Sequence, residues 1–122
     1  MKLINKLWLK SLIEEGCDQI LREMQRGYQY DAPIINQENK SILALIDLYF
    51  KAKKELLIMI ERKAIDGYPA AIQAEYDGVY ATCEPTYKWI DIKGDYETPG
   101  EHGCEIDYGN ILITIDDELF ND

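Results

Sequence analysis

Hydrophobic residues in the first quarter of the chain recur three or four positions apart, which predicts a helix over about residues 2–26. Gly27 predicts its end, because glycine readily takes the left-handed conformation that closes a helix. Gly16 weakens the middle of this helix. Ser11 and Glu14 have the spacing of a capping box, which offers a second helix start at that point.

A second amphipathic stretch predicts a helix over about residues 37–66, ended by Gly67 and Pro69. Its hydrophobic residues cover a wide arc, so we expect the central element of the fold, packed on more than one side. The stripe consists of Ile42, Ile46, Tyr49, Phe50, Leu57 and Ile60, broadened by Leu45, Leu48, Leu56 and Met59.

After Pro69 the pattern changes to alternation. Asp77-Gly78 predicts a two-residue hairpin turn, and TYKWIDIKGDY and ILITI have the composition of strands. The predicted fold class is α+β in a single domain, residues 1–122, with a helical part (1–67) and an acidic β part (68–122). Two N-terminal helices, about 2–26 and 37–66, would pack on a small C-terminal antiparallel sheet, about 70–118.

The net charge of −10 lies almost entirely in the last third of the chain. Residues 1–82 hold twelve acids and eleven bases, whereas residues 83–122 hold eleven acids and two bases. Such a surface repels phosphate backbones, so direct nucleic-acid binding is disfavoured. It would attract a basic protein surface. The alternative is that the acids only keep a small protein in solution.

The chain has three cysteines, a number that is both small and odd for a disulfide framework. We find no secretory signal. We also find no hydrophobic run of the roughly 18 residues that a membrane span needs. We therefore expect a reduced, cytoplasmic protein that does not bind membranes.

Cys83, His102 and Cys104 are of zinc-ligand type, but only His-x-Cys is local, and a fourth ligand would have to be a carboxylate. A Cys–His nucleophilic pair is disfavoured by the neighbouring Glu101 and Glu105, because negative charge raises the pKa of a thiol. We also expect His102 and Cys104 to flank a turn. The sequence therefore predicts no catalytic residue, metal or cofactor.

Nine tyrosines, several of them among acids, form a composition typical of protein interfaces, because tyrosine offers a large rigid contact with a polar tip. They could equally cover a thin sheet whose other face is wet. The candidate residues for binding a partner protein are Tyr87, Trp89, Asp91, Asp95, Tyr96, Glu97, Glu105, Asp107 and Tyr108.

The segment from Tyr87 to Leu119 contains an acidic-aromatic strand (YKWIDIKGDY), a turn (TPG) and an isoleucine strand that ends in Asp-Asp-Glu-Leu. In composition and turn placement it resembles small acidic accessory proteins of tailed phages and prophages, over the last third of the chain only. The resemblance implies a virus- or mobile-element-like origin, location in the host cytoplasm and action by binding.

The sequence thus favours a non-enzymatic protein that binds a basic partner, in a sharper form an inhibitor that occupies the groove of a nucleic-acid-handling, host-defence enzyme. One alternative is a structural or assembly component that self-associates through the first helix and the wide face of the second. The other is a small metal-dependent hydrolase that uses Asp116, Asp117 and Glu118.

Overall fold

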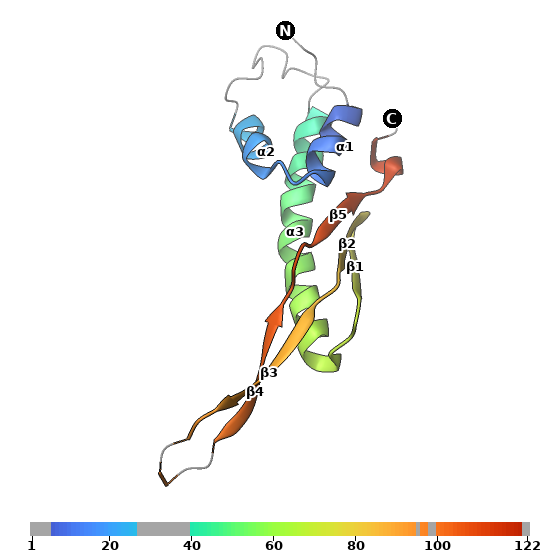
Figure 1. The fold of residues 1–122 in the computed structure, drawn as a ribbon. Helices are drawn as coiled ribbons and strands as arrows, with labels where there is room; N and C mark the ends of the chain where they lie inside the picture. The colour runs from blue at the N-terminus through green and yellow to red at the C-terminus, as the bar shows by residue number, and fades with distance from the viewer. Residues whose placement is uncertain (1–5, 27–39, 95, 98–99, 121–122) are drawn as a thin grey trace.

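The computed structural model describes residues 6–26, 40–94, 96–97 and 100–120. The helices come first: α1 (Lys6–Glu14), α2 (Asp18–Gln25) and α3 (Lys40–Gly67). The strands follow: β1 (Ile72–Tyr76), β2 (Val79–Cys83), β3 (Thr86–Ile92), β4 (Glu101–Asp107) and β5 (Leu112–Ile115), with a short 3-10 helix, η2 (Asp117–Phe120), after them. The α+β class is confirmed (Figure 1).

The prediction of one helix over residues 2–26 is wrong. Gly16 has a φ of +72°, a left-handed conformation that ends α1, and the chain turns before α2 begins at Asp18. Ser11, the predicted restart, lies inside α1. Residues 2–5, Gly27 and the predicted connector from Tyr28 to Asn36 lie outside the described residues.

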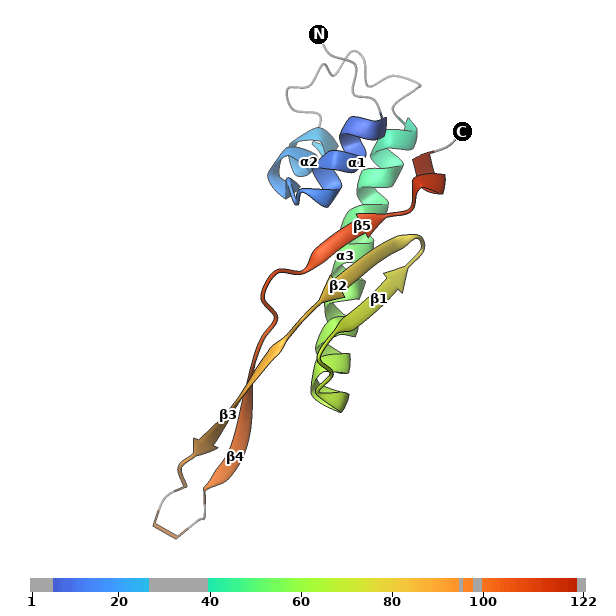
Figure 2. The ribbon, with the colours of Figure 1, turned by 45° about the vertical axis from the view of Figure 1, so that its right-hand side comes forward.

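The predicted second helix is confirmed as α3, which has 28 residues; positions 37–39 of the predicted range are not described. α1 and α2 pack against its N-terminal half, and the sheet packs against the rest (Figures 1 and 2). Its fully or nearly fully buried side chains are Ile42, Leu45, Ile46, Tyr49, Ala52, Leu56, Ile60 and Ala64. Leu57, expected on the core side, is 39% exposed.

The predicted Asp-Gly turn is also confirmed. Asp77 and Gly78 have φ values of +47° and +87°, the left-handed pair that a tight hairpin requires, and they join β1 to β2. β5 pairs with the other edge of β2, giving an antiparallel sheet in the order β1-β2-β5. Its inner side packs against α3 through β1 and β2 and against α1 through β5, with the buried residues Ile72, Ala74, Val79, Ala81, Cys83, Ile113 and Ile115.

The expectation of a single C-terminal sheet is wrong, because β3 and β4 form a separate two-stranded sheet. This hairpin, residues 86–107, is called the arm here; the helices with the three-stranded sheet are the body. The arm projects from the body beyond the C-terminal end of α3 (Figure 1). No helix in the described ranges combines the length and apolar content that crossing a membrane requires.

Candidate functional site

The arm continues the central strand β2 and the edge strand β5 of the body through a bulge. Between the pairs Thr82↔Leu112 and Thr86↔Asp107, residues 83–85 face residues 108–111, so one strand carries one extra residue. Gly109 in this segment has a φ of +56° and donates its N–H to Asp107 Oδ1 at 2.8 Å. The bulge changes the direction of the two strands where they leave the body. We call the side of the arm that continues the core side of the sheet its inner side, and the opposite side its outer side.

The alternation of buried and exposed side chains from β2 into β3 shows this continuity. Val79, Ala81, Cys83 and Pro85 are buried, and the next residues of the same parity are Tyr87 and Trp89. No further helix covers them, since α3 ends at Gly67. Trp89 is accordingly 63% exposed, although its position in the pattern is a core position.

Three aromatic rings stand where α3 ends. The ring of Tyr68 lies edge-on to that of Tyr87, with centroids 5.4 Å apart, and 5.2 Å from that of Trp89. The Tyr87 hydroxyl donates to the carbonyl of Pro69 at 3.0 Å. Burial raises the pKa of Tyr87, with nearby Cys104 adding to the shift. This cluster fastens the root of the arm to the body and leaves the indole accessible.

The inner side of the arm becomes polar toward its tip. Asp91 lies opposite His102 in the register, and Asp91 Oδ1 is 2.6 Å from Nδ1 of His102. Both side chains are exposed. Nearer the root, Cys104 faces Trp89 and Ile106 faces Tyr87. The inner side thus combines an aromatic root with an ionisable tip.

The outer side of the arm carries most of the acids. Glu101, Glu105 and Asp107 alternate along β4 on this side. Lys88 lies directly opposite Glu105 and offsets part of its charge. Toward the tip, Gly103 leaves room for Ile92, whose Cδ1 would come within 3.0 Å of a Cβ placed there.

The predicted binding residues are therefore divided between two sides. Tyr87, Trp89 and Asp91 face inward, whereas Glu105 and Asp107 face outward. Glu97 and Tyr96 are exposed near the tip, and Asp95 lies outside the described residues. Tyr108 is half-buried in the bulge; burial raises its pKa, and Glu61 adds to the shift.

The structure separates the three metal-ligand candidates. Cys83 is buried in the body and donates its thiol to the carbonyl of Tyr108 at 3.1 Å, while His102 and Cys104 lie on the arm. The prediction of a turn at Gly103 is wrong, because β4 runs straight through it and places His102 and Cys104 on one side. No three His, Cys, Asp or Glu side chains within the described ranges are grouped to hold a metal.

The thiol of Cys83 is held in its neutral form. Burial raises its pKa, and the charges of Asp107 and Glu84 raise it further. A nucleophilic cysteine needs the opposite surroundings. We therefore assign Cys83 to the packing of the body.

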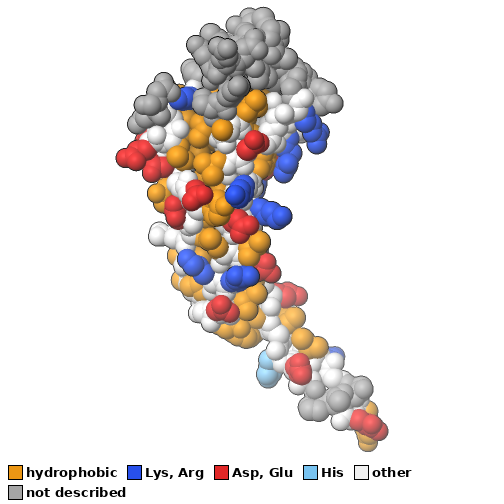
Figure 3. Space-filling model, turned by 180° about the vertical axis from the view of Figure 1, so that it is seen from behind, with side chains coloured by type: hydrophobic (Ala, Val, Ile, Leu, Met, Phe, Trp, Pro, Cys, Tyr) orange, Lys and Arg blue, Asp and Glu red, His pale blue; other side chains and the backbone are white. Residues whose placement is uncertain are grey.

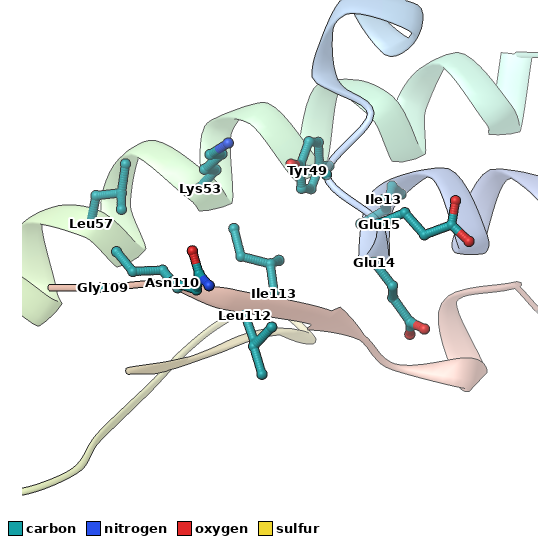
Figure 4. A pocket seen from close by; sticks show the side chains of 12 residues that line it. Ile13, Glu14, Glu15, Tyr49, Lys53, Leu57, Gly109, Asn110, Leu112 and Ile113 are labelled. Carbon is teal, nitrogen blue, oxygen red and sulfur yellow. The ribbon is translucent and has the colours of Figure 1, made fainter. Parts of the chain in front are cut away.

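A cavity of about 440 Å³ opens between the end of α1, α3 and β5 (Figure 4). Near it, Asp18 accepts hydrogen bonds from the Tyr49 hydroxyl and Lys53 Nζ, both at 2.5 Å. Partial burial works against ionisation, but these donors outweigh it and lower the pKa of Asp18. Burial and Asp18 raise the pKa of Tyr49. A tyrosine with a raised pKa is a weak acid, so Tyr49 is poorly suited to transfer a proton. The hydrogen bonds of Asp18 instead fasten α2 to α3.

The sequence analysis missed this network and Tyr68. Asp18 is 31 and 35 positions from its two partners, so no local spacing reveals the contact. Tyr68 follows the end of α3 with a φ of +45°, and its meeting with Tyr87 depends on the tertiary fold.

Three comparisons with known proteins found no match: no family model, no curated protein and no solved structure matches the chain.

Proposed function

We propose that the protein is a non-enzymatic accessory protein that binds another protein through its arm. The observation that carries this proposal is the exposed continuation of the core pattern onto the arm. Trp89 occupies a core position, yet 63% of it is exposed. Tryptophan and tyrosine are the residue types that most often dominate binding energy at interfaces.

The isolation of the arm supports the same function. A two-stranded hairpin alone is marginally stable in water, and among the described residues the ring contact and the hydrogen bond that join this one to the body lie at its root. Ile92 and Tyr96 add exposed hydrophobic surface toward the tip. A partner that covers the arm would bury these side chains and stabilise the strand pairing.

The charge of the arm indicates a basic partner. Residues 86–107 hold six acids and two bases. The sharper form of the proposal, an inhibitor that imitates nucleic acid, would depend on Glu101, Glu105 and Asp107 on the outer side. Lys88 opposite Glu105 weakens such a row, so we propose protein binding in general and treat the mimicry as one outcome of the test.

The test is capture of partners by the tagged full chain from its source cell, followed by binding measurements with each purified candidate at low and high salt. Trp89→Ala should weaken binding at least about tenfold, the scale of an interface hot spot. The matched control is Tyr80→Ala, an exposed aromatic on the water-facing side of the body. Equal binding by both variants would contradict the proposal.

A triple variant, Glu101→Lys, Glu105→Lys and Asp107→Lys, separates the two forms. If it slows association and removes the salt dependence with a nucleic-acid-binding partner, mimicry is supported. If Trp89→Ala weakens binding and the triple variant does not, the aromatic inner side is the binding surface and mimicry is rejected.

A further inference from the structure

The side of α3 that points away from the core carries an unusual row of residues. Ile58 and Ile65 lie opposite the buried Leu56 and Ile60 and are 38% and 50% exposed. Exposed basic residues continue the row at three- and four-residue spacing. We call this set the outer stripe; it consists of Lys51, Lys54, Ile58, Arg62 and Ile65.

The outer stripe matches the arm in chemistry. It offers three cations around two isoleucines, with Glu55 and Glu61 at its two margins. The outer side of the arm offers Ile92, which is 52% exposed, among the acids of β4, whereas Trp89 lies on the inner side. Hydrophobic centres would therefore meet, and the surrounding charges have opposite signs, which favours encounter and fixes orientation. Figure 3 shows the back of the molecule, where hydrophobic side chains lie between charged ones along the body and acids accompany them on the arm.

The two surfaces also match in length. The seven residues of β3 extend about 23 Å at roughly 3.3 Å per residue. The fifteen residues from Lys51 to Ile65 rise about 22 Å along the axis of α3 at roughly 1.5 Å per residue.

The arm cannot reach the outer stripe of its own chain. It leaves the body past the end of α3, and its root rests on Tyr68 and Pro69 (Figures 1 and 2). Except for Lys51, whose Nζ lies 6.0 Å from the centroid of the Tyr76 ring in β1, the outer stripe faces away from the sheet from which the arm extends. Only another molecule can bring the two surfaces together.

We propose that the outer side of the arm of one copy packs along the outer stripe of α3 in a second copy of this chain. This proposal rests on the proposed function, since it names a partner for the arm. Such a contact joins different surfaces of the two copies, so it either closes into a reciprocal dimer or ring, or propagates into a filament.

The experiment is light scattering coupled to size exclusion over a range of concentrations, at low and high salt. Wild-type protein should self-associate, less at high salt. Ile92→Asp changes the outer side of the arm, Ile58→Asp with Arg62→Glu changes the outer stripe, and each should weaken association at least about tenfold. Leu112→Asp is the control, because Leu112 is a 62% exposed residue on the opposite face of the body.

The direct readout is zero-length carboxyl-to-amine cross-linking of a mixture of isotopically heavy and light copies. Mixed-label links between Glu101, Glu105 or Asp107 and Lys51 or Lys54 are expected. Mixed-label links confined to arm–arm or helix–helix pairs would overturn the proposal.

A wild-type chain that is monomeric at every concentration would also overturn it. If such a monomer still bound a different protein in a Trp89-dependent way, the proposed function would stand and only the second copy would be rejected. If Ile92→Asp left self-association unchanged and Trp89→Ala left the binding of other proteins unchanged, both proposals would fail.

Discussion

The body and the arm are built from the same two chain segments, but only the body has a helix against its inner side. In the body the alternating residues Val79, Ala81 and Cys83 are at most 2% exposed. In the arm the alternation continues, and Trp89 at an equivalent position is 63% exposed. The difference arises from where α3 ends, at Gly67.

Alternation therefore specifies which side of a strand is apolar, and a second element decides whether that side is buried. An exposed tryptophan beyond the end of α3 would favour aggregation of an isolated monomer. We therefore expect that contacts within the body supply most of the free energy of unfolding. The arm should open locally with little effect on the body.

The largest effect should come from truncating the face of α3 that the body buries. Leu56→Ala should lower the free energy of unfolding by about 2–5 kcal/mol, because Leu56 is fully buried and the change leaves a cavity. Leu57→Ala is the matched control; its side chain is 39% exposed, and the loss should stay below about 1 kcal/mol. Urea denaturation measures both, and similar losses would mean that the body is not the core described here.

The body was largely predictable from sequence, because local signals coincide with tertiary ones there. The wide stripe of α3 and the Asp77-Gly78 turn each have a local physical cause. The separation of the arm was not predictable, since it depends on one extra residue between paired segments more than twenty positions apart. The candidate binding residues stay a prediction, and the sequence did not reveal that they divide between an inner and an outer side of the arm.

The link between α2 and α3 should give the next largest effect. Asp18→Asn removes the ion pair with Lys53, which is partly exposed, so the expected loss at neutral pH is about 1–2 kcal/mol. The pKa of Asp18 is lowered in the folded state, so its stabilising contribution is complete above the unfolded value of 3.8 and is lost as the pH falls through the folded pKa. The difference between wild type and Asp18→Asn should therefore disappear in acid; a difference independent of pH would contradict the assignment.

A substitution at the tip should affect the arm alone. A Cβ at Gly100 would lie 2.5 Å from the carbonyl oxygen of Ile92, so Gly100→Ala must displace backbone. Gly103→Ala is the control, because its nearest neighbour is the flexible end of Ile92 at 3.0 Å. Hydrogen exchange should accelerate in β3 and β4 for Gly100→Ala by the equivalent of about 1 kcal/mol, with α3 unchanged. Faster exchange throughout the body would show that the two regions unfold together.

The smallest effect should arise at the root, where one hydrogen bond ties the two regions. Tyr87→Phe keeps the ring against Tyr68 and removes only the donor to the Pro69 carbonyl, at an expected cost of about 0.5–1.5 kcal/mol. Tyr80→Phe, on the water-facing side of the sheet, should change stability by less than about 0.5 kcal/mol. If the bond fixes the arm, exchange of the β3 amides should accelerate more than that of β2 in the Tyr87 variant. Uniform acceleration would instead assign Tyr87 to the core of the body, and the boundary between the two regions would move outward to Trp89.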